Sequence, residues 1–244
     1  MRTRMIAIGN FLFRYRNKVF PLIIIALFVI AIPPHKLFGS QSYENLKDAG
    51  AFLLAVAGLA VRGVVIGYAY IKRGGMNKQV YADDLVTQGM FSLCRNPLYV
   101  GNILIYIAVF IMHGDPLVMA LGITLFTFVY YCIIFAEEAY LLNKFGDQYR
   151  AYCRDVPRWI PKISRFKRAT ESMRFDLKRV FIKDYSTMAS TLVTLCIVQL
   201  YEHLGFDSIH GHENHIALLA VALINIGMAA YFIRVWKKRP NSQR

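Results

Sequence analysis

Residues 97–136 read PLYVGNILIYIAVFIMH, then Gly114-Asp115, then PLVMALGITLFTFVYYCIIFA. Apart from the short polar connection, both runs are almost entirely apolar, and the second is long enough to span a bilayer as a helix. The first run is short for a full crossing. We therefore predict a tight helical hairpin in a membrane, whose first arm need not cross the whole hydrocarbon layer.

Four further windows are apolar and long enough to be bilayer helices. They cover residues 19–38, 49–71, 187–204 and 216–236. Of the 244 residues, 56% are apolar and only 18% are charged, which is typical of integral membrane proteins. The sequence therefore predicts an all-α, polytopic membrane bundle of about six transmembrane helices, with the hairpin at its core.

The basic residues are distributed unevenly, although the net charge of +14 would by itself allow nucleic-acid binding. If the six windows cross the membrane alternately, 26 of the 29 Lys and Arg fall on one side, at residues 2–18, 72–95, 144–183 and 234–244. Lys36 and Lys47 fall on the other side, and Arg62 lies within a span. This positive-inside pattern predicts that both termini and the two long loops are cytoplasmic. Membrane topology and attraction to anionic lipid headgroups therefore account for the excess of basic residues, and we expect no nucleic-acid partner.

The chain shows no repeats and no low-complexity segment, and we divide it into three parts. These are N-terminal spans (1–71), a core (72–165) and a C-terminal part with a polybasic linker and two spans (166–244). Residues 162–185 are polybasic and moderately amphipathic, so we expect an interfacial helix or linker. No small-x-small cleavage site follows the first apolar run, which predicts an uncleaved first span. The four cysteines are scattered, so neither disulfides nor a cysteine metal site is expected.

Arg95, Asn96 and Pro97 mark the start of the first hairpin helix on the predicted cytoplasmic side. Asn is a favoured N-cap residue, and Pro fits the first helical position because its missing N–H costs nothing there. The unpaired N–H groups and positive dipole end of such a helix bind anions, with Arg95 alongside. A capped helix whose Arg meets lipid phosphate is the alternative. Tyr99 adds an aromatic face and a hydroxyl, and Gly101 allows close approach of a ligand or of a neighbouring helix.

Glu137 and Glu138 are adjacent acids at the cytoplasmic end of the second hairpin helix, after a run without charge. They are either solvated acids or ligands for the ammonium or hydroxyl groups of a bound molecule. Acids at a helix C-terminus oppose the macrodipole, which favours a functional reason for their placement. We expect Phe145-Gly146 to end this helix, because Gly suits a C-terminal cap. Residues 145–161, with several aromatic residues, Pro157 and Pro161, are expected to form a lid over the membrane surface.

Taken in order, these blocks resemble the signature of the isoprenylcysteine carboxyl methyltransferase and phospholipid methyltransferase superfamily. Leu85-Val86-Thr87-Gln88-Gly89-Met90-Phe91 is similar to the family's Leu-Val-Thr-x-Gly-x-aromatic segment, and 95–101 to its Arg-His/Asn-Pro-x-Tyr-x-Gly motif. The resemblance covers somewhat under half of the chain. It implies a membrane enzyme that transfers a methyl group from S-adenosylmethionine and releases S-adenosylhomocysteine. The hairpin would then be the catalytic core.

The resemblance also implies positions for the cofactor. Leu85, Val86 and Phe91 would line the adenosine pocket. Asn96, Pro97, Leu98 and Tyr99 would surround the methionine part beside Arg95, and Glu137, with Glu138, would hold polar groups. Two departures stand out. Asn96 replaces the His of the isoprenylcysteine branch, and Ile133 replaces an Arg thought to face a substrate carboxylate. The acceptor is therefore expected to be a lipid or a prenylated molecule, and its nucleophile can be a carboxylate, an amine or a thiol. The sequence does not indicate an oligomeric state.

The candidate catalytic residues are Tyr99, Glu138 and Arg62. An ammonium nucleophile must lose a proton first, and Asp83, Asp84 and Glu138 are the candidate bases. Arg62 lies about nine residues (~13 Å) inside its span, where a charge suggests function. Its partner is expected to be either a substrate anion or a carboxylate within the bundle.

Three other possibilities remain from the sequence. Sterol-type reductases share a related core and use NADPH, but they resemble Arg-His-x-Asn-Tyr-x-Gly-Asp, whereas Asn102 follows Gly101 here. A non-catalytic scaffold is the second. The third is a metal site among His203, His210, His212 and His215, for which an exposed polar loop is the preferred interpretation.

Overall fold

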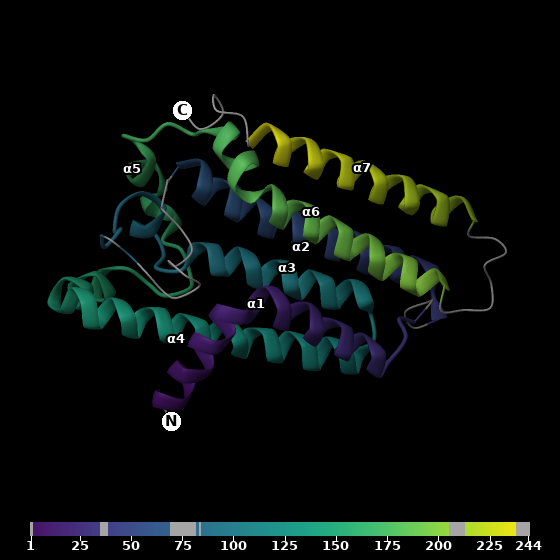
Figure 1. The fold of residues 1–244 in the computed structure, drawn as a ribbon, viewed down its shortest axis with the longest axis horizontal. Coiled ribbons are helices and arrows are strands. Elements are labelled where there is room, and N and C mark those ends of the chain that lie inside the picture. The colour runs from purple at the N-terminus through teal and green to yellow at the C-terminus, as the bar shows by residue number, and fades with distance from the viewer. Residues whose placement is uncertain (1, 35–38, 69–81, 83, 205–212, 238–244) are drawn as a thin grey trace.

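A computed structural model describes residues 2–34, 39–68, 82, 84–204 and 213–237. Within this part, all regular structure is helical, and the long helices run side by side (Figure 1). The bounds are α1 Arg2–Ile30, α2 Gln41–Tyr68, η3 Gly89–Ser92, α3 Pro97–His113, α4 Pro116–Asp155, η4 Ile163–Arg165, α5 Phe166–Thr170, α6 Leu177–Leu204 and α7 Glu213–Lys237. This architecture confirms the predicted all-α, polytopic membrane bundle.

Four of the described helices, α2, α4, α6 and α7, are long and apolar enough to cross a membrane. Helix α3 has 17 residues and is the shorter arm that the sequence predicted. The first predicted window, 19–38, is only partly helical, because α1 ends at Ile30, and residues 35–38 lie outside the described part. Pro21 lies inside α1, which changes direction along its length (Figure 1), as expected where Pro removes a helical hydrogen bond.

The predicted hairpin between α3 and α4 is confirmed. Gly114 follows α3 with a left-handed backbone (φ 81°), which a residue without a Cβ adopts at little cost. The Asp115 carboxylate then accepts hydrogen bonds from the backbone N–H groups of Leu117 (3.0 Å) and Val118 (2.9 Å). Pro116 is the first helical residue. A C-terminal glycine and an N-terminal cap thus reverse the chain within two residues.

Helix α3 lies between two apolar cores. One core joins it to α1 and α4, and the other joins it to α2 and α6. Gly58 of α2 faces Gly101 of α3, where a Cβ on Gly58 would lie 2.7 Å from the Gly101 carbonyl oxygen. Gly101 therefore allows close contact with α2, one of its two predicted uses, and this contact holds the start of α3 deep in the bundle.

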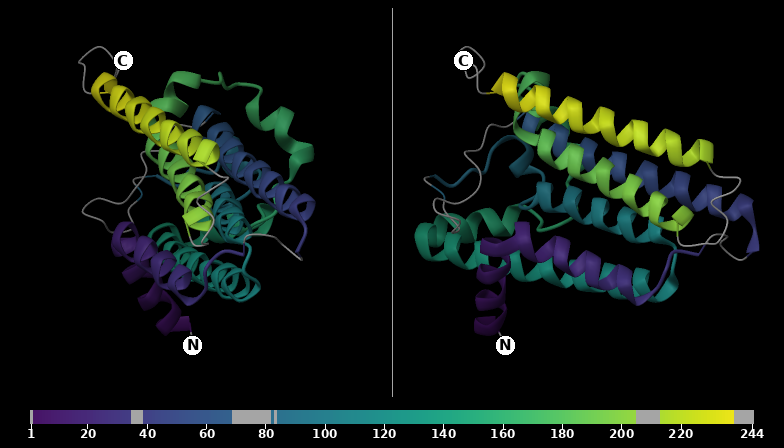
Figure 2. Two further views of the ribbon diagram at one scale, coloured as in Figure 1. Left: turned by 90° about the vertical axis from the view of Figure 1, so that its right-hand side faces the viewer. Right: turned by 45° about the vertical axis from the view of Figure 1, so that its right-hand side comes forward.

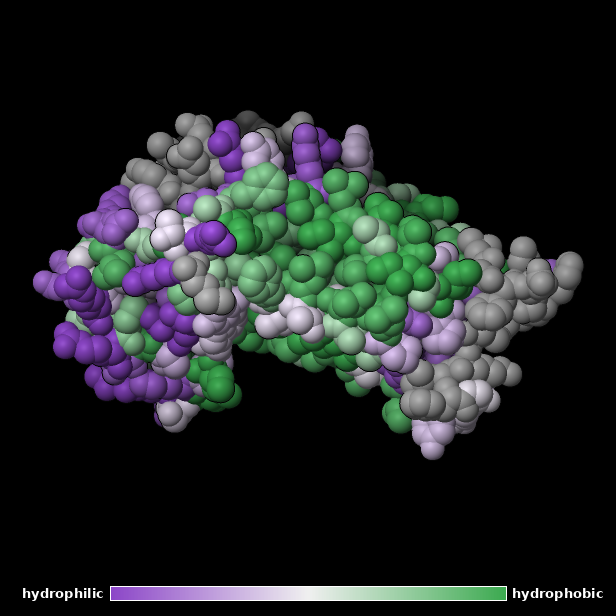
Figure 3. Space-filling view, turned by 90° about the horizontal axis from the view of Figure 1, so that it is seen from below, coloured by the Kyte–Doolittle hydropathy of each residue, from purple (hydrophilic) through white to green (hydrophobic). Residues whose placement is uncertain are grey.

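The surface separates an apolar belt from a hydrophilic end. Seen from below, apolar residues cover the middle of the molecule, and hydrophilic residues gather at the end that carries α5 and the end of α4 (Figure 3). In the region expected to be interfacial, residues 162–185, the chain forms η4, α5 and the start of α6. Ile160, just before this region, and Ile163 within it are 80% and 77% exposed, which suits insertion among lipid headgroups beside basic side chains.

Candidate active site

Helix α4 carries the two adjacent acids further from its end than the sequence suggested. The helix continues past Glu138 and breaks at Gly146, whose φ of 50° and ψ of −118° are not helical, and a second helical segment ends at Asp155. The macrodipole argument for the acids was therefore wrong, because they do not lie in a last helical turn. The break at Gly146 was expected, but a helical segment and not a loop follows it.

The hydroxyl of Tyr99 donates a 2.6 Å hydrogen bond to the Glu137 carboxylate. Tyr99 lies in the first turn of α3 and is buried, whereas Glu137 lies on α4 and is half-buried. The start of one hairpin helix and the acids of the other are thus in direct contact. The ring of Tyr99 also lies 5.5 Å from that of Tyr130, so an aromatic wall continues from the polar contact into the bundle.

Glu138 is held by two arginines. Arg158 donates from Nε (3.0 Å) and from a terminal nitrogen (2.6 Å) to the two carboxylate oxygens, and Arg95 lies 3.6 Å away. Burial alone would lower the pKa of Arg158, but pairing with Glu138 raises it above its ordinary value. Arg158 was not among the predicted site residues. Its place in the segment 145–161, which was expected to cover the site, was the available signal.

Residues 157–162 form a strap across the start of α3. The backbone N–H of Arg95 donates to the Pro157 carbonyl (2.9 Å), and that of Lys162 donates to the Leu93 carbonyl (3.0 Å). The Asn96 side chain donates to the Arg158 carbonyl (3.2 Å). The strap contributes Arg158 to a group with Arg95, Tyr99, Glu137 and Glu138, which we call the cytoplasmic cluster after the side of the membrane that the sequence predicts for it. Of the expected lid, residues 145–161, only this last part is an extended segment, and its role as a lid stays a prediction.

The start of α3 retains donors for a ligand. Asn96 is the N-cap and Pro97 the first helical residue, as predicted, but the Asn96 side chain does not accept a hydrogen bond from the helix. It faces the strap instead. The Nε of Arg95 is buried and has no hydrogen-bond partner within the described part of the chain. Such a group favours a bound anion, because an unpaired buried donor costs roughly 1–3 kcal/mol.

The three residues expected at the adenosine differ in exposure. Phe91 is buried with Leu93 and Leu98 in a third core, while Leu85 is half-buried and Val86 is 38% exposed. Two open hollows of about 500 and 490 Å³ lie beside this segment, and both are lined by Thr87, Ser92 and Asp155. Leu85 lines the second hollow, together with Tyr152 and Val156, whereas Val86, Phe91 and the cytoplasmic cluster line neither.

Arg62 is paired with a carboxylate of the bundle. Its Nε donates to Asp184 of α6 (2.9 Å), and its terminal nitrogens contact Asp184, Asn102 of α3 and Thr187. Both ends of this ion pair are buried. The structure therefore shows the second of the two predicted partners, and a catalytic use of Arg62 stays a prediction.

The other candidate residues have different surroundings. Ile133 is 1% exposed and packs with residues of α1 in the first core. Asp84 is exposed, and Asp83 lies outside the described residues. Of the three candidate bases, only Glu138 belongs to the cytoplasmic cluster, and its carboxylate is engaged by Arg158.

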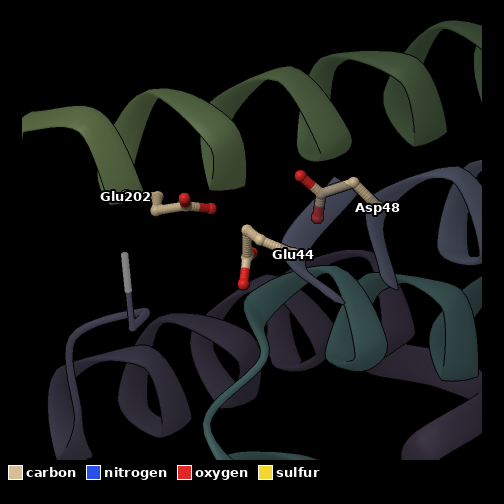
Figure 4. Close-up of side chains that lie close together, drawn as sticks. All are labelled: Glu44, Asp48 and Glu202. Carbon is tan, nitrogen blue, oxygen red and sulfur yellow. The ribbon is translucent and has the colours of Figure 1, made fainter. Parts of the chain in front are cut away.

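A second charged cluster lies at the opposite end of the bundle. Glu44 and Asp48 of α2 and Glu202 of α6 converge (Figure 4). Lys47 contacts Glu44, lies 3.1 Å from Asp48, and donates to the Met112 carbonyl of α3 (3.0 Å). We call these four residues the far cluster. An internal cation thus supplies its counter-charge and links three helices.

The predicted histidine group is divided between buried and exposed positions. His203 is 8% exposed in the last turn of α6, which corrects the expectation of an exposed loop at this residue. His215 is exposed on α7, with its ring centroid 5.8 Å from that of His203. His210 and His212 lie outside the described residues.

Comparison with known proteins points to methyl transfer. Residues 49–148 match the phospholipid methyltransferase family. Over 80 residues, the chain is 36% identical to the protein-S-isoprenylcysteine O-methyltransferase of Schizosaccharomyces pombe, covering 32% of this chain and 34% of that protein. No solved structure matches the chain significantly.

Two bacterial relatives cover more of the chain. The cobalt-zinc-cadmium resistance protein CzcN of Cupriavidus metallidurans is 29% identical over 164 residues, which are 66% of this chain and 70% of that protein. The nickel-cobalt-cadmium resistance protein NccN of Alcaligenes xylosoxydans xylosoxydans is 26% identical over 160 residues, 66% of this chain and 71% of that protein. Their names state no reaction.

The family match runs from α2 to just beyond the break at Gly146, so it includes Arg95, Tyr99, Glu137 and Glu138. It supports methyl transfer over the reductase alternative. Together with the apolar helices, these findings support a membrane methyltransferase and are consistent with the isoprenylcysteine carboxyl methyltransferase and phospholipid methyltransferase superfamily.

Proposed function

We propose that this chain transfers a methyl group from S-adenosylmethionine to an apolar acceptor within the bilayer, on the cytoplasmic side. One observation carries the proposal: the start of α3 and the acids of α4 meet through Tyr99 and Glu137 beneath the strap. A polar methyl donor and an apolar acceptor must meet at a membrane surface. The cytoplasmic cluster lies where polar loops cover the apolar bundle, and the positive-inside distribution assigns this end to the cytoplasm.

The residues of the cytoplasmic cluster fit an amino-acid-like ligand. Its carboxylate suits the unpaired Nε of Arg95 and the start of α3, and its ammonium suits Glu137. The hydrophobic segment Leu85, Val86 and Phe91 would border the adenosine, and Pro97, Leu98 and Asn96 the methionine part. When bound, S-adenosylmethionine supplies an electrophilic methyl group. The protein contributes by positioning, which is worth up to about 7–11 kcal/mol in favourable cases.

We further propose that the acceptor nucleophile is an amine or a thiol and not a carboxylate. A carboxylate acceptor needs a cation close to the reacting centre. Ile133 supplies none and is buried beneath α1, and Arg62 is already neutralised by Asp184. Arg158 is likewise engaged by Glu138. An amine or thiol nucleophile on an apolar acceptor therefore suits the charges that the structure places near the site.

The experiment combines labelled S-adenosylmethionine with the full chain in nanodiscs made from native lipids. Transfer of label to the organic phase and its loss with Glu137→Gln are expected, because Glu137 contacts the start of α3. Glu171→Gln is the matched control, since Glu171 is an exposed acid outside the cluster. Mass spectrometry of the labelled lipid then distinguishes an N-methyl or S-methyl product from a methyl ester.

The same preparation distinguishes the alternatives. S-adenosylhomocysteine binding that Glu137→Gln abolishes, without transfer to any lipid, would leave a donor-binding scaffold. Absence of binding by the folded wild type would contradict the proposal. A methyl ester product would overturn only the choice of nucleophile.

A further inference from the structure

Helix α7 carries an amide side chain in the middle of its apolar length. It lies at the edge of the bundle along α6 (Figures 1 and 2), and none of its residues is buried. Asn225 is twelve residues from either end of Glu213–Lys237, which is about 18 Å at 1.5 Å per residue. Since the hydrocarbon core of a bilayer is about 30 Å thick, Asn225 lies near its midplane.

Asn225 points away from α6. The half-buried residues within α7 recur at helical spacing and define the side that packs on α6: Ile216, Leu219, Ala222, Leu223, Ile226, Ala230 and Ile233. Asn225 lies off this stripe and is exposed. Leu218 and Val221 precede it by seven and four residues, Met228 and Phe232 follow it by three and seven, and all four are also exposed. We call these five residues the outer face of α7.

The amide of Asn225 is incompletely satisfied. Its Nδ2 donates to the Val221 carbonyl one turn earlier (2.8 Å), and the rest of the described chain supplies no partner for its Oδ1. Hydrocarbon offers no hydrogen bonds, so a polar group at this depth is costly unless a protein partner satisfies it. In membrane bundles, such side chains face other helices and hydrogen-bond across the interface.

We propose that a second copy of this chain packs against the outer face of α7, with the two Asn225 amides hydrogen-bonded to each other. An amide has both a donor and an acceptor, so it is complementary to itself across a two-fold axis. A lipid chain lacks both groups. Ala229, one turn after Asn225, is exposed and small enough for the helices to approach closely. The active site lies with α3 and α4, away from α7, so dimerisation leaves it accessible (Figure 1).

The test measures association of the full chain in lipid vesicles by energy transfer between donor- and acceptor-labelled copies over a range of protein-to-lipid ratios. We expect a saturable dimer in the wild type. Asn225→Leu should raise its dissociation constant about tenfold, because an interhelical amide hydrogen bond in a membrane is worth about 1–2 kcal/mol and 1.4 kcal/mol is tenfold. Asn225→Gln keeps the amide and should restore most of the association.

Asn214→Leu is the matched control, because it removes an exposed Asn from the same helix near its end, where water can satisfy the amide. Its dissociation constant should equal that of the wild type. A monomeric wild type at every ratio would overturn the proposal, as would equal effects of Asn225→Leu and Asn214→Leu. Association only in native membrane extracts would also overturn it, because it would indicate a different protein on the outer face. Unchanged methyl transfer in Asn225→Leu vesicles checks that the variant folds.

Discussion

The cytoplasmic cluster and the far cluster are built from the same kinds of side chain, yet their surroundings differ. In the far cluster, Glu44 and Glu202 are 1% and 3% exposed, and the Lys47 ammonium lies among the carboxylates. In the cytoplasmic cluster, the side chains of Glu138 and Arg158 are 13% and 28% exposed, and the buried Nε of Arg95 lacks a partner. The first arrangement gathers three acids around one internal cation and joins helices. The second keeps unsatisfied donors beneath a strap, which suits a ligand.

Breaking the far cluster should have the largest effect on stability. Lys47→Met leaves three acids together without their cation, and removing one partner of a buried ion pair costs about 3–5 kcal/mol. The measurement is the unfolding midpoint in detergent. Lys167→Met, which removes an exposed cation, should leave that midpoint unchanged. An unchanged unfolding midpoint in Lys47→Met would contradict this stabilising role of the far cluster.

The Arg62–Asp184 pair provides the next test, because it joins α6 to α2 and α3. Either Arg62→Met or Asp184→Leu alone should destabilise the protein by about 3 kcal/mol, whereas the double variant should recover most of the loss. Thermal unfolding and methyl transfer are measured together. If the double variant regains stability but not activity, Arg62 acts on the acceptor as well as on the fold.

Arg158→Lys sharpens the contrast at the cytoplasmic cluster. Lysine keeps the charge but cannot make the two-point contact with Glu138, so donor binding should weaken by about 1.5–3 kcal/mol while stability changes little. Binding of S-adenosylhomocysteine by calorimetry is the measurement. Arg150→Lys is the control, since Arg150 pairs only with exposed Asp147. Equal affinities of the two variants would contradict this assignment.

The smallest expected effect is that of Tyr99→Phe. It removes one hydrogen bond to Glu137 and retains the ring against Tyr130, so affinity for the donor should fall by about 0.5–1.5 kcal/mol. Tyr140→Phe is the control at a half-buried tyrosine beyond the acids on the same helix. A fall in stability equal to the fall in affinity would show that the Tyr99 contact serves only the fold.

Much of the fold could be predicted, because long apolar runs in the sequence identify membrane helices. The hairpin was predictable residue by residue, since Gly114, Asp115 and Pro116 each have a local conformational reason for their position. The break at Gly146 was also expected, but the helical segment from 147 to 155 was not, because no apolar run marks it. The three-part division of the chain stays a prediction.

The candidate site was predictable in its members but not in its pairings. Tyr99 and Glu137 belong to separate motifs, and only the hairpin brings them to 2.6 Å. Arg158 was missed, because its partner Glu138 lies twenty residues earlier and no periodicity relates them. Arg62 had two possible partners, and the choice of Asp184 depends on a contact 122 residues away in sequence.

By itself, the sequence determined that this protein lies in a membrane, which end is basic, and which motifs carry the chemistry. Each of these follows from local composition, spacing or charge asymmetry. The tertiary structure alone decided which charges neutralise one another and which remain available to a ligand. That distinction depends on the packing of distant helices, because burial and partners, and not residue type, set the free energy of a charge.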